Sequence, residues 1–304
     1  MATRLMLLDA PSLYFRAFYG VPETITAPDG TPVNAIRGLI DMIARLVRTR
    51  RPSYLVACMD ADWRPAFRVD ALPSYKAHRV GPDGGDQTPP ALGAQVPVIE
   101  EVLDAVGLAR VGVPGYEADD VIGTLATLSP GPTDVVTGDR DLFQLVDDRT
   151  PVRVLYTAKG IANLVVVDEA GVTERYGIPG RAYADFALLR GDPSDGLPGV
   201  AGVGDKTAAA LTSRFGGVEG IIAALDAGET AGFPAGSRTK LLASHEYLET
   251  APMVVRVVCD VPMPTYDDRL PSEPRDKERL VELSDRWNLD GPLNRLLAAL
   301  SPAE

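Results

Sequence analysis

Acidic side chains follow four apolar runs in the first half of the 304-residue sequence. The densest group lies in residues 114–123, PGYEADDVIG, where the three acids Glu117, Asp119 and Asp120 lie within four consecutive positions. Like charges this close raise one another's pKa values unless a cation neutralises them. Taken alone, the stretch is typical of a helix start, because carboxylates are favoured at the positive end of the helix dipole.

The other three runs have the same arrangement. Asp9 ends the run 4–9, Asp60 ends the run 54–60, and Asp139 and Asp141 follow the run 133–138. Each run predicts a buried strand, and the patterned segments between them predict helices, including 96–106, 117–128 and 141–148. Alternating strands and helices are typical of an α/β layer with a mainly parallel sheet. Because ligands bind beyond the carboxyl ends of parallel strands, we expect these acids to meet at one edge.

Divalent cations are the natural partners of such a cluster, because Mg²⁺ and Mn²⁺ prefer oxygen ligands. Two such ions about 4 Å apart can clamp the attacking and leaving oxygens of a phosphodiester and activate a water molecule. The chain has only two histidines, His78 and His245, and neither has a cysteine nearby. A zinc site of His and Cys ligands is therefore not supported.

A second acidic motif lies in residues 189–208, LRGDPSDGLPGVAGVGDKTA. Asp192 and Asp195 form a D-x-x-D pair ahead of a glycine-rich turn. The turn does not match a phosphate-binding P-loop, because Asp205 separates Gly204 from Lys206. Its backbone N–H groups could approach a nucleic-acid phosphate, and a plain turn between helices is an equally good interpretation.

Composition bounds the class of protein. The hydrophobic fraction of 45% and the charged fraction of 24% are ordinary for a soluble globular chain. No run of about 18 apolar residues occurs, so no membrane span is expected. Cys58 and Cys259 are isolated, which argues against disulfides and favours a reducing cytosol. The net charge of −12 argues against a protein that binds nucleic acid. When the nine candidate site acids are left out, however, the formal charge of the remaining chain is only −3.

The remaining segments give three further expectations. Thr31 is placed to cap a helix that starts at Pro32. Residues 152–156 and 163–167 predict a β-hairpin. Residues 81–93, GPDGGDQTPPALG, predict a flexible loop that either gates a substrate or is an exposed insertion, the plainer alternative.

Five motifs, in order, resemble the 5′-nuclease family of bacterial DNA polymerase I N-terminal domains, phage 5′-exonucleases and flap endonucleases. They are LLDAPSLYFRAF, CMDADWRPAFR followed by SYKAHR, GYEADDVIGTLA, TGDRDLFQLV and LLRGDPSDGLPGVAGVGDKTA. They cover roughly residues 4–225. The chain is similar to a stand-alone bacterial member, since no polymerase domain is expected after them.

The resemblance implies a PIN-like α/β core over residues 1–174, with a helical arch at about 64–95. A helix-three-turn-helix DNA-binding domain would occupy 175–260, and helices at 261–304 would pack back on the core. Nine acids would hold two or more Mg²⁺ or Mn²⁺ ions: Asp9, Asp60, Glu117, Asp119, Asp120, Asp139, Asp141, Asp192 and Asp195.

The resemblance also implies contacts with DNA. Arg68 and Lys76 would stabilise the scissile phosphate. Arg16 would lie near the 5′ end, and Tyr75 could stack on a base. The other implied DNA-binding residues are Arg79, Gly199, Gly202, Gly204, Lys206 and Thr207, with a K⁺ ion held at the glycine hairpin.

Two positions depart from the family pattern. Gly196 follows the D-x-x-D pair where the family usually has Asn, and Arg140 stands between Asp139 and Asp141 where it usually has Lys. The second change keeps the charge. The first removes a hydrogen-bonding side chain beside Asp195 and bears on the geometry of the second metal.

The implied function is a structure-specific 5′→3′ exonuclease and flap endonuclease. It would act in replication and repair on DNA with 5′ ends or flaps and on RNA-primed DNA. A cytoplasmic, nucleoid-associated monomer with no membrane association is expected. The alternatives are a single-strand ribonuclease of the PIN class and a non-catalytic module that binds DNA structures. Neither would need all the acids together with the glycine turn.

Overall fold

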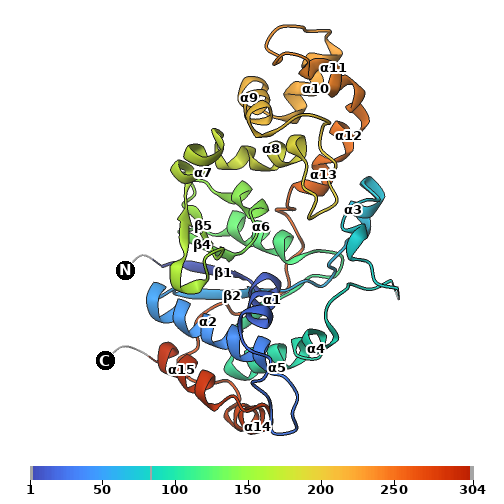
Figure 1. Ribbon diagram of the computed structural model, residues 1–304. Coiled ribbons are helices and arrows are strands. Elements are labelled where there is room, and N and C mark those ends of the chain that lie inside the picture. The colour runs from blue at the N-terminus through green and yellow to red at the C-terminus, as the bar shows by residue number, and fades with distance from the viewer. Residues whose placement is uncertain (1–2, 83, 302–304) are drawn as a thin grey trace.

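A six-stranded sheet forms the centre of the molecule in a computed structural model that describes residues 3–82 and 84–301 (Figure 1). The strands are β1 (Leu5–Asp9), β2 (Tyr54–Cys58), β3 (Ala109–Val111), β4 (Thr133–Thr137), β5 (Val152–Tyr156) and β6 (Val165–Val167). Their order is β3-β2-β1-β4-β5-β6, and every neighbouring pair is parallel except β5 with β6. The mainly parallel sheet and the predicted hairpin are confirmed.

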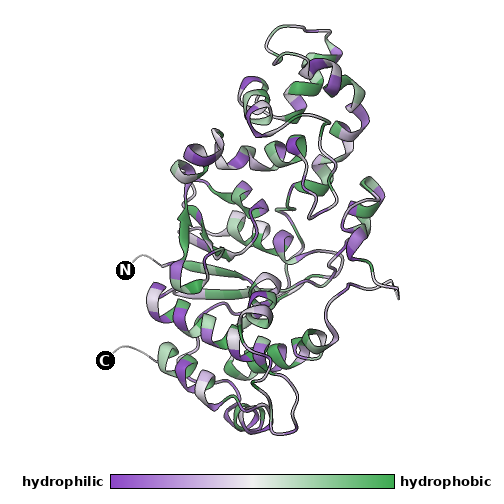
Figure 2. Cartoon of the chain, in the orientation of Figure 1, coloured by the Kyte–Doolittle hydropathy of each residue, from purple (hydrophilic) through white to green (hydrophobic). Residues whose placement is uncertain are grey.

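Both faces of the sheet carry buried side chains, which explains why most strand positions are apolar (Figure 2). Met6 and Leu8 of β1 belong to one buried cluster and Leu7 to the other, since successive side chains point to opposite faces. Each such side chain contributes about 1.5–3 kcal/mol by leaving water. The first cluster includes residues of α1 (Ala10–Gly20), α2 (Asn34–Arg50), α5 (Val96–Val106), α14 (Lys277–Trp287) and α15 (Asp290–Leu300). At the surface of this face, α14 packs on α5 and α15 on α2.

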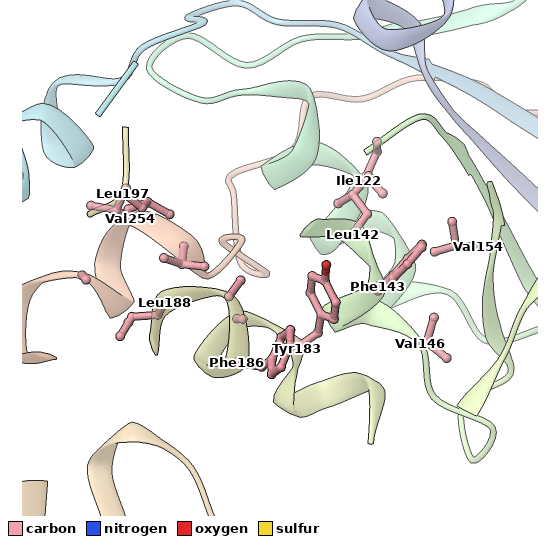
Figure 3. Packing of buried hydrophobic residues seen from close by; sticks show 14 of the residues in the cluster. Ile122, Leu142, Phe143, Val146, Val154, Tyr183, Phe186, Leu188, Leu197 and Val254 are labelled. Atoms are coloured by element: carbon pink, nitrogen blue, oxygen red, sulfur yellow. The ribbon is translucent and has the colours of Figure 1, made fainter. Parts of the chain in front are cut away.

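The second cluster continues from the sheet into the helical second half of the chain (Figure 3). It includes α6 (Ala118–Leu128) and the short helix η2 (Asp141–Leu145), where the ring of Phe143 lies 5.4 Å from that of Tyr183. The helices beyond it are α7 (Glu169–Tyr176), η4 (Gly180–Ala182), α8 (Tyr183–Arg190), α9 (Asp205–Phe215), α10 (Val218–Asp226), α11 (Ser237–Ala243), α12 (His245–Thr250) and α13 (Pro252–Val255). One continuous core therefore joins the sheet to the helices.

Within the described residues, no single helix has the length and apolar content to cross a membrane. Only α9 and α10 taken together reach that length and composition, and they are bent by 75°.

Three local expectations need correction. Helix α2 begins at Asn34, and Thr31 lies in a preceding turn, where its N–H donates to Asp29. The predicted helix 141–148 is a 3₁₀ helix that ends at Leu145. Residues 81–93 are partly ordered by a bridge between Val80 and Asp86 and by helix α4 (Pro90–Gly93), with residue 83 outside the described part of the chain. The arch segment also contains α3 (Ala66–Ala71) and η1 (Ala77–Arg79).

The start of α2 is capped from a distant part of the sequence. The Oε1 atom of Gln95 accepts hydrogen bonds from the N–H groups of Ala35 (2.9 Å) and Ile36 (3.3 Å). Its Nε2 atom donates to the side chain of Asn34 (3.1 Å) and to the carbonyl of Ala91 (3.0 Å). Gln95 is 1% exposed, so water does not replace these bonds.

We predict that Gln95→Ala lowers the free energy of unfolding by about 1–3 kcal/mol, because it leaves buried helix-start groups without partners. Urea denaturation followed by circular dichroism measures the change. Gln87→Ala, at an exposed glutamine in the arch segment, serves as control. Equal stability of Gln95→Ala and the wild type would contradict this capping role.

Candidate metal centre

A cavity of about 700 Å³ lies at the carboxyl edge of the sheet. Six of the predicted site acids line it: Asp9, Asp60, Glu117, Asp119, Asp139 and Asp192. They come from the ends of four strands and from the loop after α8. The expected meeting of strand-end acids is thus observed. The chain order reverses between β1 and β4, a topological switch point of the kind at which α/β sheets bind ligands.

Asp9 lies at the centre of this edge and is 5% exposed. Its carboxylate accepts hydrogen bonds from the Thr137 hydroxyl (2.5 Å) and the Ser12 N–H (3.1 Å). Burial raises its pKa to about 7 against the effect of these bonds, and the neighbouring charges of Asp139 and Asp60 raise it further. Asp9 also caps α1, so the helix-cap interpretation and the site interpretation both apply to it.

Asp60 and Asp119 flank the start of α6. The Ala118 N–H donates to Asp60 (2.8 Å), but burial, reinforced by the charge of Glu117, raises the pKa of Asp60 to about 6. Burial also raises the pKa of Asp119 well above its usual range, and Asp9 and Asp139 add to the effect. The raised pKa values mean that these carboxylates bind protons more readily than exposed ones, and a bound cation would compete with those protons.

Glu117 differs from these acids because the chain itself supplies its cations. Its Oε2 atom accepts from the Tyr75 hydroxyl and from Arg68 Nη1, both at 2.6 Å, and its Oε1 atom contacts the Lys76 ammonium. Burial lowers the pKa of the Lys76 ammonium. The negative charges of Glu117 and Asp195 outweigh this effect and raise that pKa above its ordinary value. Lys76 and Glu117 both line the cavity, so the predicted position of Lys76 at the site is observed.

Three predicted roles need correction. Asp120 is fully buried and accepts from both terminal nitrogens of Arg68 (2.6 and 2.8 Å), so it is the partner of a cation inside the protein, outside the cavity lining. Arg68 is 2% exposed and cannot reach a substrate phosphate from there. Tyr75 is 4% exposed, with its hydroxyl on Glu117, and has no free face on which a base could stack.

Asp139, Asp141, Asp192 and Asp195 form a neighbouring group. Burial raises the pKa of Asp141 well above its usual range, followed by the charges of Asp139 and Asp195. Burial also raises the pKa of Asp195, although Lys76 and Arg79 oppose the shift. Asp139 and Asp192 line the cavity, whereas Asp141 and Asp195 are outside its lining.

The base of the arch is bonded to the D-x-x-D loop. Lys76 N–H donates to the carbonyl of Asp195 (3.0 Å), and the Ser74 hydroxyl donates to that of Gly196 (2.8 Å). Arg79 donates to the carbonyl of Ser194 (2.7 Å) and to the Asp195 carboxylate (3.0 Å). Arg79 therefore lies in the cavity wall bound to an acid.

The close approach of the arch base to the D-x-x-D loop requires a glycine at position 196. Its φ is +74°, and a Cβ atom there would lie 2.1 Å from the carbonyl oxygen of Ser74. The absence of the family asparagine thus has a steric reason, because the arch base occupies the space of a side chain.

The glycine turn lies outside the cavity lining. Gly199 (φ +66°) and Gly202 (φ +70°) shape it, and buried Val200 and Val203 anchor it. Gly204 precedes α9, with Lys206 exposed and Thr207 partly exposed in its first turn. Lys240 donates to the carbonyl of Gly202 (3.0 Å) and adds a positive charge that the sequence analysis did not single out.

Arg16 also lies outside the cavity lining, near Gly138 at its edge. Its Nε atom is buried without a hydrogen-bond partner. Lining residues that were not expected from the sequence include Phe15, Trp63, His78 and Asp86. Phe15 and Trp63 follow Asp9 and Asp60 within a few positions in the quoted motifs, which is the signal that could have found them.

The donor set fits hard divalent ions, since the cavity acids offer only oxygen. Among residues 3–82 and 84–301, no group of three or more His, Cys, Asp or Glu side chains is already arranged to enclose a metal ion. Mg²⁺ usually keeps several waters and binds one or two carboxylates together with substrate phosphates. An open, acid-lined cavity suits that coordination better than a closed cage.

Comparison with known proteins agrees with this site. A 5'-3' exonuclease, N-terminal resolvase-like domain matches residues 4–177, and a 5'-3' exonuclease, C-terminal SAM fold matches residues 178–278. A Streptomyces coelicolor "5'-3' exonuclease" is 59% identical over 97% of this chain and 100% of its own length. A Mycobacterium tuberculosis "5'-3' exonuclease" is 52% identical over 99% and 98%. The DNA polymerase I of Mycobacterium bovis is 37% identical over 98% of this chain, which spans 32% of that protein.

Solved structures share the fold. T5 5'-exonuclease with bound zinc ions has a TM-score of 0.66 at 18% identity, over 98% of this chain and 100% of that one. The catalytic core of Rad2 with DNA substrate has a TM-score of 0.59 at 16% identity, over 98% and 93%. The predicted fold class, a mainly parallel resolvase-like α/β core followed by a helical C-terminal domain, is confirmed.

We predict that Gly196→Asn lowers the free energy of unfolding by about 1–3 kcal/mol or more and displaces the arch base, because the new side chain meets the Ser74 carbonyl. Thermal denaturation measures the change. The matched control is Gly228→Asn, at the same kind of positive φ (+72°) but with no atom within 4 Å of the added Cβ. A loss no larger than that of the control would contradict the steric account.

We also predict that Mg²⁺ stabilises the protein more at pH 8 than at pH 5.5. Asp9 and Asp60 have folded-state pKa values above their unfolded values, so without metal they reduce stability as pH rises from about 4 towards 7. Mg²⁺ requires the charged carboxylates and competes with their protons. Melting temperatures with Mg²⁺ and with EDTA at both pH values test this, and equal shifts at pH 5.5 and 8 would contradict it.

Proposed function

Because this chain belongs to the 5'-3' exonuclease family, we propose that it is a metal-dependent, structure-specific nuclease. It hydrolyses phosphodiesters of DNA near 5′ ends and flaps, including RNA-primed DNA. The observation that carries this proposal is the convergence of acids from four strand ends on one cavity, with Lys76 in its wall.

The acids of the cavity would hold Mg²⁺ or Mn²⁺ in two neighbouring groups. Asp9, Asp60, Glu117 and Asp119 form one, and Asp139 and Asp192, with Asp141 and Asp195 beside them, form the other. When bound, two such ions lower the pKa of water and stabilise charge on the attacking and leaving oxygens of a phosphodiester. The charges of Asp141 and Asp195 interact with those of Asp139 and Asp192 and shape the field of the second group.

Basic side chains of the arch base would meet the phosphate. The Lys76 ammonium lies in the cavity wall on Glu117, from where it can donate to a phosphate oxygen that enters beside it. Arg79 lies next to it on Asp195. The aromatic rings of Phe15 and Trp63 line the same space and offer apolar surface to a sugar or a base.

The helical domain would hold the duplex beside the cleavage site. The turn at Gly199–Gly204 exposes backbone N–H groups next to Lys206 and Lys240, and such groups suit phosphate contacts that carry no sequence information. A K⁺ ion at this turn belongs to the same proposal. Because these contacts pair basic groups with phosphates, DNA affinity should fall steeply with salt. A cytoplasmic, nucleoid-associated monomer fits this role.

The decisive experiment uses a 5′-labelled DNA flap duplex with Mg²⁺ or Mn²⁺. We expect cleavage near the flap junction by the wild type and a loss of at least about 100-fold in Asp139→Ala, since a metal ligand supplies several kcal/mol. Asp139 is exposed, so its replacement should leave the fold intact. Asp148→Ala, at an exposed acid outside the cavity, is the control.

A single-stranded RNA incubated in parallel with the DNA flap gives the alternatives distinct outcomes. Cleavage of single-stranded RNA alone would indicate a PIN-class ribonuclease. Flap binding without cleavage by the wild type would indicate a non-catalytic DNA-binding module. Equal cleavage by wild type and Asp139→Ala would remove the acid-lined cavity as the active site.

A further inference from the structure

A short segment connects the helical domain to the acids of the cavity. Residues 254–258 comprise the end of α13 and the extended chain that follows it, and they run beside α6 and η2; we call them the strap (Figure 1). Among the core side chains that bind the strap through its backbone are Arg68, Asp120 and Gln144. Each is a hydrogen-bond partner or a near sequence neighbour of an acid of the metal centre.

Arg68 joins the strap to Glu117. Its Nε atom donates to the carbonyl of Val254 (3.0 Å), and Nη2 donates to that of Arg256 (3.4 Å). The same guanidinium donates to Glu117 Oε2 (2.6 Å) and to both oxygens of Asp120. Because the guanidinium is planar and rigid, a movement of the strap also moves the donor that holds Glu117.

Gln144 makes the equivalent connection to Asp141. Its Nε2 atom donates to the carbonyl of Val255 (3.1 Å) and to the main-chain carbonyl of Asp141 itself (2.8 Å), one turn earlier in η2. Its Oε1 atom accepts from Val257 N–H (3.0 Å). The Gln144 amide thus binds the strap with both its nitrogen and its oxygen, and it fixes Asp141. The charge of the Asp141 carboxylate interacts with those of Asp139, Asp192 and Asp195.

Asp120 completes the attachment. Its Oδ1 atom accepts from Val258 N–H (2.8 Å), and its Oδ2 atom accepts from Glu117 N–H (3.2 Å). Asp120 therefore contacts the end of the strap while it holds the start of α6, where Glu117 and Asp119 lie. This network also explains the burial of an acid that the family resemblance placed among the metal ligands.

The other side of the strap is bound to the helical domain. The Arg256 side chain donates to Asp185 in α8 (2.7 Å) and to Glu219 in α10 (2.9 Å). The strap is therefore held by its side chain to the helical domain and by its backbone to the core. A shift of the helical domain must be transmitted to Arg68 and Gln144 or break these bonds.

We propose that Arg68 and Gln144 are positioning residues that use the strap to hold Glu117 and Asp141 in place for divalent cations. They act through these acids and the strap, without touching the substrate. This inference rests on the proposed metal-dependent function and deepens it. It assigns a role to Gln144, which no expectation from the sequence singled out, and replaces the phosphate contact expected of Arg68.

A purely structural network would give a different result on mutation. If the bonds only support folding, their loss lowers stability and leaves the affinity of the folded protein for metal unchanged. If they position the acids, metal affinity falls as well. Removal of groups that orient metal ligands typically weakens metal binding or activity by about 10–100-fold.

The test measures Mn²⁺ binding by isothermal titration calorimetry on the full chain without DNA. The variants are Gln144→Ala, Gln144→Glu and Arg68→Lys. Gln144→Glu keeps the shape and the acceptor for Val257 N–H but removes both donated bonds. Arg68→Lys keeps the charge for the buried acids but loses the planar fork, whereas Arg68→Ala would leave those acids unpaired. Arg110→Ala, which removes an exposed ion pair with Asp104, is the control.

We expect all three variants to bind Mn²⁺ about 10–100-fold more weakly than wild type, with Arg110→Ala unchanged. Duplex binding in EDTA should also be unchanged, since the glycine turn is intact. Wild-type Mn²⁺ affinity in the folded variants, with only a lower melting temperature, would overturn the positioning role. If the wild type bound no Mn²⁺, the proposed function would fail first, and this inference with it.

Discussion

Mutual repulsion among carboxylates at one edge of the sheet is the constraint on which the rest of the structure depends. Parallel strands bring their carboxyl ends together, so acids that are far apart in sequence share one cavity. Burial and neighbouring charges raise the pKa values of Asp9, Asp60 and Asp119. The fold tolerates the repulsion between these carboxylates because protons, cations of the chain or bound metal ions can neutralise their charge.

The chain divides its acids into two kinds. Glu117 and Asp120 are neutralised by Arg68 and Lys76, and Asp134 inside β4 is likewise paired with arginines. Asp9 and Asp119 have no such ion pair among the described residues, although both lie in the same region. Pairing of the first kind holds elements together and, at Glu117, keeps in place a carboxylate that also lines the cavity, whereas acids of the second kind depend on protons or metal ions for neutralisation.

Much of the site follows from sequence because its signal is local. A buried strand that ends in Asp9 or Asp60 needs only the parallel topology to place its acid at the common edge. The incorrect roles of Arg68, Tyr75 and Asp120 arise from contacts between distant segments. The partners of Arg68 include the backbone of Val254, 186 positions away. Spacing within a motif cannot show whether its cation faces a substrate or another part of the chain.

The same limit applies to the fold. The strands and most helices follow their apolar patterns, but α2 begins where Gln95 caps it and not at Thr31. Gly196 departs from the family pattern because the Ser74 carbonyl approaches it closely, a contact between segments more than a hundred positions apart. Local chemistry predicts the elements, and packing between them decides where they begin and which side chains remain free.

The central claim is that the strand-end acids form a divalent-cation centre. Crystals grown with Mn²⁺ and measured at an energy with strong manganese anomalous scattering test it most directly. If the acids form such a centre, anomalous peaks will lie inside the cavity. Carboxylate oxygens of Asp139, and of either Asp9 or Asp119, will lie about 2.0–2.2 Å from the ions, as expected for small divalent metals. Well-diffracting crystals with no peak in the cavity at saturating Mn²⁺, or with manganese bound only elsewhere, would contradict it.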